Sequence, residues 1–214
     1  AVTAAGILFA ILLCWRARSM NYAMVLLFAA GILWFYSSSY KRILWLGNFI
    51  VAFLMALVPL VVALFQNQFM LLEYSMSPDA DFLMSGCLKY TSAFSALMFG
   101  WTFVIEVVKD MSTEKGDREL ECHTFPIVWG IKKTKILLYV WITIMWIVSG
   151  FIVYQTPELH ASSSLRFFAC AMVIPAWSLY YIIAKAQNAG DYKLIVQYLL
   201  VILAVNMAYS AVLF

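Results

Sequence analysis

Long apolar runs alternate with short polar connections along the whole chain, and this pattern sets the class of fold. Seven apolar segments can be delimited, at residues 1–14, 22–38, 47–65, 82–108, 136–154, 167–184 and 194–214. Most approach the ~20 residues that a helix needs to cross a bilayer. They are continuously apolar, without the alternation of a transmembrane strand. We therefore expect an all-α integral membrane protein, a polytopic bundle of about seven transmembrane helices.

The composition supports this interpretation. Hydrophobic residues make up 65% of the chain and charged residues 12%, whereas a soluble domain is nearer one half and one quarter. The four cysteines form no C-x-x-C pair, which argues against a zinc site or a disulfide framework. No repeat, low-complexity segment or Pro/Gly-rich linker divides the sequence, so residues 1–214 are expected to form a single domain. Nothing in the sequence indicates an oligomeric state.

The chain begins without Met, inside an apolar run that is short for a membrane span. We interpret it as a fragment of a longer protein whose N-terminal part is missing. Because no basic region precedes this apolar run, we do not expect it to be a signal peptide.

Basic residues gather on one side of the predicted bundle. If alternate connections share a side, one side receives Lys41, Arg42, Lys109, Lys115, Arg118, Lys132, Lys133, Lys135, Lys185 and Lys193. The other side has three arginines and the acidic residues Glu73, Asp79, Asp81 and Glu158. The positive-inside rule makes the first side cytoplasmic. The net charge of +3 therefore reflects membrane topology, and no nucleic-acid partner is expected.

Four carboxylates follow the apolar run 82–108, on the predicted cytoplasmic side. Glu106, Asp110, Glu114 and Asp117 are spaced so that a continuous helix would align them in one stripe. A bound cation would relieve their repulsion, and oxygen ligands suit Mg²⁺. Since Mg²⁺ is usually held by one or two carboxylates plus substrate phosphates, this pattern predicts a phosphate or pyrophosphate substrate, lipid in character.

Basic residues lie among these carboxylates. Lys109, Lys115 and Arg118 are placed to meet phosphate oxygens, and Gly116 is expected to bend the chain. The alternative is a solvated face of mixed charge that caps a helix, and spacing alone does not decide between the two.

A second polar cluster lies on the same predicted side. Tyr36-Ser-Ser-Ser-Tyr40-Lys41-Arg42 ends one apolar run, and Gly47-Asn48 opens the next. Lys41 and Arg42 supply positive charge for a leaving pyrophosphate, while the rings of Tyr36 and Tyr40 suit a carbocation. The alternative is an interfacial anchor of aromatic and basic residues.

Both clusters resemble motifs of the UbiA superfamily of intramembrane prenyltransferases. Residues 106–130 are similar to its second aspartate-rich motif, close to E-I-x-K-D-x-x-D-x-x-G-D-x-x-x-G-x-x-T-L-P-x-x-x-G. The matches are Glu106, Lys109, Asp110, Gly116, Asp117, Thr124, Pro126 and Gly130. Residues 36–48 are similar to its Y-S-x-x-x-K-R-x-x-x-x-G-N element, with matches at Tyr36, Ser37, Lys41, Arg42, Gly47 and Asn48.

The resemblance implies a fold, a reaction and roles for the matched residues. The seven segments correspond to the third to ninth helices of a nine-helix fold. A prenyl group would pass from a polyprenyl pyrophosphate donor to a membrane-embedded acceptor. Mg²⁺ would be held by Asp110 and Asp117, together with a first motif, N-D-x-x-D-x-x-x-D, that does not occur in this sequence. The leaving pyrophosphate would be assisted by Lys41, Arg42 and Lys109, and the allylic cation would be stabilised by Tyr36 and Tyr40. Asn48, Arg118 and Glu106 would contribute to substrate binding.

Three departures from the motif affect these expectations. Thr113 occupies the position of the motif's middle aspartate, Glu121 replaces its usual glycine and Phe125 replaces its usual leucine. Because a threonine is a poor Mg²⁺ ligand, we expect Glu114 to replace the missing carboxylate at the metal. The alternative is a homologue with weakened activity.

The acceptor is the least defined part of the prediction. The matched elements look most like the branch that alkylates geranylgeranylglyceryl phosphate in ether-lipid synthesis, in a bacterial or archaeal cell membrane. Quinone-precursor and other aromatic prenyltransferases share the same core. A non-catalytic polytopic membrane protein or a transporter is the alternative outside the enzyme class.

Overall fold

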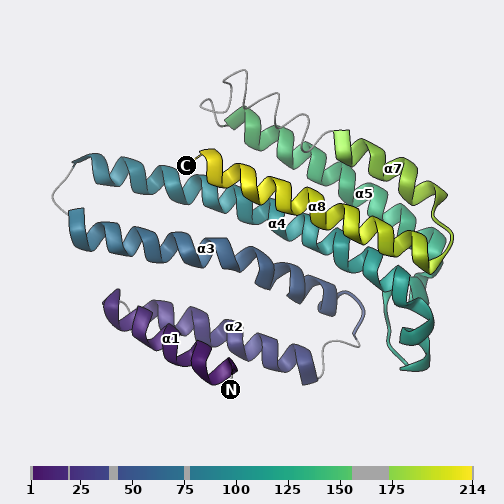
Figure 1. The fold of residues 1–214 in the computed structure, drawn as a ribbon, viewed down its shortest axis with the longest axis horizontal. Helices are drawn as coiled ribbons and strands as arrows, with labels where there is room; N and C mark the ends of the chain where they lie inside the picture. The colour runs from purple at the N-terminus through teal and green to yellow at the C-terminus, as the bar shows by residue number, and fades with distance from the viewer. Residues whose placement is uncertain (1, 19, 39–42, 75–77, 156–173, 214) are drawn as a thin grey trace.

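The computed structural model describes residues 2–18, 20–38, 43–74, 78–155 and 174–213. They form the helices α1 (Val2–Arg16), α2 (Met20–Ser38), α3 (Leu46–Tyr74), α4 (Pro78–Glu119), α5 (Phe125–Gln155), α7 (Ile174–Lys185) and α8 (Ala189–Leu213). No strand occurs in this part of the chain, so the predicted all-α fold is confirmed (Figure 1). Each predicted apolar segment coincides with one of these helices, the sixth from residue 174 onward.

Three of the described helices are long and apolar enough to cross a membrane, over Leu46–Glu73 in α3, Ser85–Glu119 in α4 and Phe125–Ile152 in α5. α3 contains Pro59 in its interior, which is tolerated in membrane helices because neighbouring groups satisfy the freed carbonyl. Few residues of the apolar windows in α3 and α5 are buried within the bundle, 11% and 22%, as expected of helices that contact lipid.

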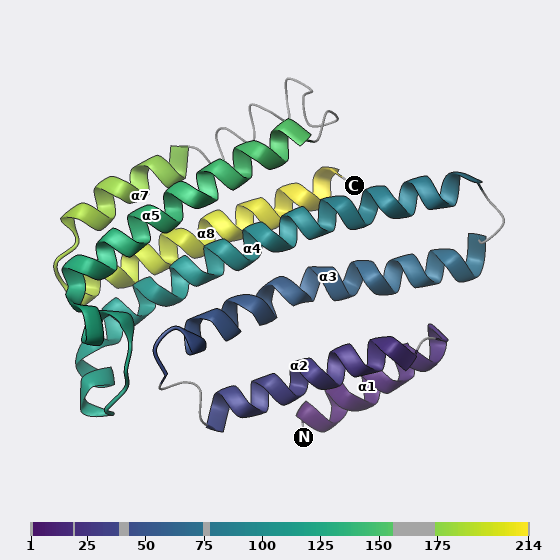
Figure 2. The same ribbon diagram turned by 180° about the vertical axis from the view of Figure 1, so that it is seen from behind.

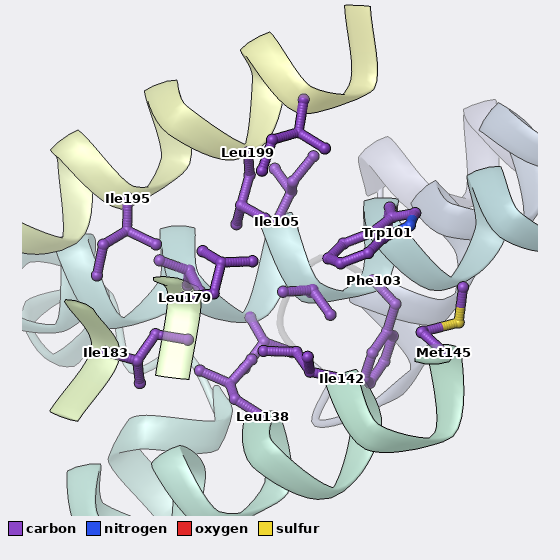
Figure 3. Close-up of a cluster of buried hydrophobic side chains, with 14 of the residues drawn as sticks. Trp101, Phe103, Ile105, Leu138, Ile142, Met145, Leu179, Ile183, Ile195 and Leu199 are labelled. Atoms are coloured by element: carbon purple, nitrogen blue, oxygen red, sulfur yellow. The ribbon is translucent and has the colours of Figure 1, made fainter. Parts of the chain in front are cut away.

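Helix α4 lies at the centre of the bundle. It packs against α3 on one side and against α5 and α8 on the other, while α1 and α2 lie beyond α3 (Figures 1 and 2). Its buried residues from Leu97 to Met111 meet α5, α7 and α8 in one core. Figure 3 shows this core, with Leu138 and Ile142 from α5, Leu179 and Ile183 from α7, and Ile195 and Leu199 from α8 around α4.

Alternate connections share one end of the bundle, which is the assumption behind the division of the charged residues between two sides. The end of α2, the start of α3, the α4–α5 connection and the α7–α8 turn lie at one end, and α1–α2 and α3–α4 meet at the opposite end (Figures 1 and 2). The carboxylates of α4 therefore share an end of the molecule with the first turn of α3.

The turn between α7 and α8 is held by charged side chains at this same end. Nζ of Lys135 donates to the carbonyl of Ala186 at 2.7 Å, capping the C-terminus of α7 from α5. The Asp191 carboxylate accepts from the backbone N–H groups of Gln187 and Asn188, at 2.9 and 3.0 Å. These hydrogen bonds hold the pKa of Asp191 below its usual value.

Candidate functional site

The site is built on the last turns of α4. This helix continues without a break from Pro78 to Glu119, so Glu106, Asp110, Glu114 and Asp117 share one continuous helix, which is the condition for the stripe described above. The expected bend at Gly116 is wrong: the backbone stays helical there, and the chain turns only after Glu119.

Asp110 is the point at which two distant segments meet. It is half-buried, and Nδ2 of Asn48 in the first turn of α3 donates to its Oδ2 at 2.7 Å. The two residues are 62 positions apart. The two polar clusters, which the sequence places on the same side of the bundle, therefore meet at Asn48 and Asp110. No hydrogen bond to Oδ1 of Asp110 comes from the described part of the chain.

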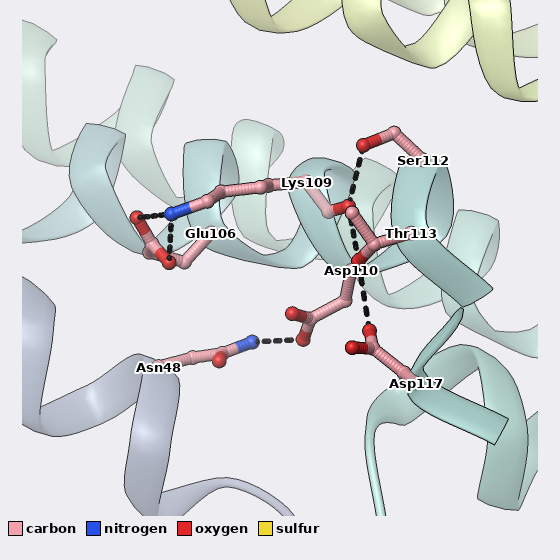
Figure 4. Close-up of polar contacts among 7 residues, drawn as sticks. All are labelled: Asn48, Glu106, Lys109, Asp110, Ser112, Thr113 and Asp117. Atoms are coloured by element: carbon pink, nitrogen blue, oxygen red, sulfur yellow. Dashed lines mark hydrogen bonds and ion pairs between the residues drawn. The ribbon is translucent and has the colours of Figure 1, made fainter. Parts of the chain in front are cut away.

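Asp117 lies one helical turn beyond Thr113 and bonds to it. The Thr113 hydroxyl is 2.7 Å from Oδ2 of Asp117 and 3.2 Å from the carbonyl of Lys109. The Lys109 carbonyl also accepts from the Ser112 hydroxyl at 2.7 Å. The Thr113 hydroxyl has a single proton, and the shorter of its two distances assigns that proton to Asp117. In Figure 4 the carboxylate of Asp110 points between Asn48 and Asp117, and the charge of Asp117 acts on Asp110.

The basic residues of the motif pair with neighbouring carboxylates. Nζ of Lys109 lies 3.3 Å from Glu106, and Nη2 of Arg118 lies 2.8 Å from Oε1 of Glu114. Both cations are largely exposed, and such pairs are worth about 0.2–1 kcal/mol. Either cation can therefore exchange its partner for a phosphate at little cost.

The second polar cluster is described only in part. Tyr36, at the end of α2, is half-buried and close enough to Glu106 and Asp110 for their charges to act on its hydroxyl. Tyr40, Lys41 and Arg42 lie outside the described residues. The structure thus brings Tyr36 and Asn48 to the carboxylates.

The carboxylate oxygens of Asp110 and Asp117 supply some, but not all, of the ligands that a hard cation such as Mg²⁺ needs. Among the described residues no three His, Cys, Asp or Glu side chains are grouped closely enough to hold a metal ion. Asp110 and Asp117 each keep a carboxylate oxygen without a described protein donor, and two carboxylates with substrate phosphates suffice for Mg²⁺. Glu114 pairs with Arg118 and lines a recess shared with residues 187–189 and Tyr192.

The chain leaves α4 through a Schellman motif that fixes the backbone of Asp117. The amide of Cys122 donates to the carbonyl of Asp117 at 2.9 Å, and that of Glu121 donates to Arg118 at 3.2 Å. Glu121 has a φ of 54°, at the position where this motif favours glycine. The motif that this segment resembles usually carries glycine here, because glycine adopts positive φ without strain. Glu121 adopts the same backbone conformation with strain.

Replacing Glu121 by glycine is expected to stabilise the protein. The left-handed conformation costs an ordinary residue about 1–2 kcal/mol, and part of the gain is offset by the freedom of glycine in the unfolded chain. We expect the free energy of unfolding to rise by roughly 0.5–1 kcal/mol, read as a higher Tm in detergent. The control is Glu119→Gly, two positions earlier on helical backbone, which should lower the Tm. A lower Tm for Glu121→Gly would contradict the assignment of strain.

The start of α5 explains the remaining matched positions. The carbonyl of Thr124 accepts from Ile127 and Val128, at 3.1 and 3.0 Å, which makes Thr124 the N-cap. Pro126 follows in the first turn, where a backbone N–H would have no partner within the helix, so the proline costs no hydrogen bond. Gly130 has φ 78° and ψ 156° and separates this short first segment from the rest of α5. A residue with a side chain would be strained there.

An aromatic cluster, Trp45, Phe103, Phe125 and Trp129, joins the starts of α3 and α5 to α4. The Trp45 ring meets Phe125 at 4.8 Å and Trp129 at 5.5 Å between centroids, both T-shaped. Phe125 also contacts Phe103 of α4 at 6.1 Å. The departure from leucine at position 125 therefore supplies an aromatic centre, 1% exposed, around which the other rings pack.

Trp45 carries backbone strain within this cluster. Its φ is 70°, which costs about 1–2 kcal/mol for a residue with a side chain. Its two ring pairs contribute about 0.5–1.5 kcal/mol each, enough to offset that strain. The sequence does not predict this conformation, because tryptophan is not a residue expected at positive φ.

Comparison with known proteins supplies one match. A model of the UbiA prenyltransferase family matches residues 1–210. Neither the curated proteins nor the solved structures give a match.

Proposed function

Since the chain belongs to the UbiA prenyltransferase family of integral membrane proteins, we propose that it transfers a prenyl group from a polyprenyl pyrophosphate to an acceptor within the membrane, with Mg²⁺ as cofactor. The observation that carries this proposal is the meeting of Asn48 with Asp110 at 2.7 Å. It joins the two polar elements at one end of the bundle, next to Asp117.

The metal is proposed to bind Asp110 and Asp117, which together with substrate phosphates suffice for Mg²⁺. Glu114 is proposed as a further ligand in place of the missing aspartate at Thr113. To reach the cation it has to leave Arg118 and turn away from the recess beside Tyr192. When bound, Mg²⁺ would neutralise charge that develops on the leaving pyrophosphate. The amide of Asn48 orients Asp110 by occupying one of its oxygens, which leaves the other for a ligand.

The group transfer breaks the bond between the allylic carbon and the pyrophosphate oxygen, and the electron pair leaves with the pyrophosphate. Lys109 and Arg118 exchange their carboxylate partners for phosphate oxygens, supported by Lys41 and Arg42. The ring faces of Tyr36 and Tyr40 stabilise the allylic cation, and Glu106 returns Lys109 to its resting position. The acceptor then forms the new bond to carbon and loses its proton.

For the acceptor we propose geranylgeranylglyceryl phosphate, supported by the resemblance of residues 36–48 and 106–110 to the ether-lipid branch. An aromatic quinone precursor is the alternative within the family. We propose that the site lies on the cytoplasmic side. Near it, at the same end of the bundle, lie the start of α5 with Lys132 and Lys133, the end of α7 with Lys185 and the start of α8 with Lys193.

A transfer assay tests the proposal. The intact membrane protein in lipid vesicles is given radiolabelled geranylgeranyl pyrophosphate with either acceptor class, in Mg²⁺ or in excess chelator. We expect labelled ether product with geranylgeranylglyceryl phosphate, and none in chelator. Product only with aromatic acceptors would move the chain to the other branch. Folded protein that gives no product with any acceptor would favour a non-catalytic homologue.

Substitutions at Thr113 and Glu114 test the replacement ligand. We expect Glu114→Ala to lower the affinity for Mg²⁺ about tenfold or more, measured as the Mg²⁺ concentration for half-maximal transfer. Thr113→Asp should be tolerated, since it restores the carboxylate of the resembling motif. Glu119→Ala, which removes an exposed carboxylate from the end of the same helix, is the control. If Glu114→Ala behaves like this control, Glu114 is not a ligand.

A further inference from the structure

Trp45 is the residue of this site that local preferences explain least. Its φ of 70° is a conformation that mainly glycine adopts. Its carbonyl accepts from the amide of Phe49 at 3.0 Å, so it stands at the N-cap of α3. That position favours Ser, Thr, Asp and Asn, whose side-chain oxygens accept hydrogen bonds from the helix. Tryptophan has no such acceptor, so neither backbone preference nor capping accounts for it.

The ring of Trp45 has contacts that do account for it. Phe125 and Trp129, its two T-shaped partners, both belong to the short segment of α5 before Gly130. These partners also meet each other at 5.4 Å. Through Phe125, which is fully buried against Phe103 of α4, the ring connects the start of α3 to the core. The side chain thus joins two helix starts that the backbone does not connect directly.

The groups that hold Asp110 and Asp117 both lie near this aromatic contact. Asn48, the donor to Asp110, follows Trp45 by less than one helical turn. On the other side, Phe125 follows the loop in which the amide of Cys122 binds the carbonyl of Asp117. A shift of the start of α3 relative to α5 would therefore move Asn48 away from Asp110.

We propose that Trp45 is a positioning residue for the metal and pyrophosphate site: its ring holds the start of α3 against the start of α5, so that Asn48 remains bonded to Asp110. This inference rests on the proposed function, because it requires Asp110 to bind the cation. In this arrangement Trp45 acts through Asn48 and is not itself proposed to bind the substrate. Its loss should therefore weaken cation and pyrophosphate binding more than it slows the chemical step.

Two variants separate the ring from the backbone strain. Trp45→Gly removes the ring and adopts positive φ without strain, so the relieved strain offsets part of the loss of the two ring pairs and the protein should remain folded. Trp45→Phe keeps an aromatic ring. The control is Trp177→Ala in α7, another exposed tryptophan, which loses a stacked partner, Trp146, elsewhere in the bundle.

The measurement is Mn²⁺ binding in the presence of inorganic pyrophosphate, followed by electron paramagnetic resonance on the intact protein in nanodiscs. We expect Trp45→Gly to weaken binding roughly tenfold, the lower end of what loss of an outer-shell partner costs. Trp45→Phe should restore most of the affinity, and Trp177→Ala should bind like the wild type. The same order is expected for half-maximal Mg²⁺ in transfer, with kcat at saturation less affected.

Three results would overturn the proposal: wild-type affinity in Trp45→Gly, equal loss in Trp45→Phe, or equal loss in Trp177→Ala. Its failure can be told apart from failure of the proposed function. A wild-type protein that binds Mn²⁺ but makes no product removes the catalytic proposal, while Trp45 is still judged by the affinities. A wild-type protein that binds no Mn²⁺ overturns both.

Discussion

Alanine at Asp110 or at Asp117 is expected to reduce Mg²⁺-dependent prenyl transfer about a thousandfold, which corresponds to about 4 kcal/mol of lost transition-state stabilisation. Each carboxylate keeps one oxygen without a described protein donor, and each is proposed to give that oxygen to the cation. Loss of either leaves the developing charge on the pyrophosphate without its main counter-charge. The measurement is the transfer rate at saturating Mg²⁺ with each variant in vesicles.

These two substitutions are expected to leave the bundle folded. Asp110→Ala leaves the Asn48 amide without its partner, at a cost of about 1–3 kcal/mol, and Asp117→Ala frees the Thr113 hydroxyl at the exposed end of α4. Helical content by circular dichroism and the Tm in detergent check this. Glu119→Ala serves as the control for loss of a nearby carboxylate. Unchanged turnover in either aspartate variant would remove that residue from the site.

The sequence predicts the helices well because each span is apolar, but it does not place their ends. The segment predicted to end at Phe65 continues as α3 to Tyr74, since Gln66, Asn67 and Gln68 are accommodated within the helix, and Asn67 is buried. Likewise, α4 continues past residue 108 through the charged motif to Glu119. Polarity interrupts a hydropathy pattern without interrupting backbone hydrogen bonds.

Motif reasoning finds the residues of the site but not their partners. Spacing along one helix places Asp110 and Asp117 on one stripe, because that relation is local. The bond from Asn48 depends on the packing of α3 against α4 and has no local signal. The strain at Trp45 and Glu121 is also invisible to residue type, since neither residue favours positive φ. At Glu121 the resemblance supplies the missing signal, through the glycine that the motif usually carries.

Replacing Asn48 by alanine is expected to weaken Mg²⁺ binding about 10–100-fold, as loss of a residue that orients a metal ligand does. The Asn48 amide holds Oδ2 of Asp110 at 2.7 Å, and without it the carboxylate can rotate away from the proposed cation. The expected signature is a higher Mg²⁺ concentration for half-maximal transfer, with a smaller change in kcat at saturation. That distinguishes Asn48 from Asp110 and Asp117, whose loss Mg²⁺ cannot restore.

Aspartate at position 48 sharpens this test because it keeps the shape of asparagine and changes only its chemistry. A carboxylate facing Asp110 cannot donate a hydrogen bond and adds like charge. We therefore expect Asn48→Asp to lower the Tm in chelator and to recover stability when Mg²⁺ is added, since the cation relieves the repulsion. Gln187→Ala, which removes an exposed amide at the same end of the bundle and keeps the backbone N–H that donates to Asp191, should change neither quantity. A Tm of Asn48→Asp that does not respond to Mg²⁺ would contradict a cation at Asp110.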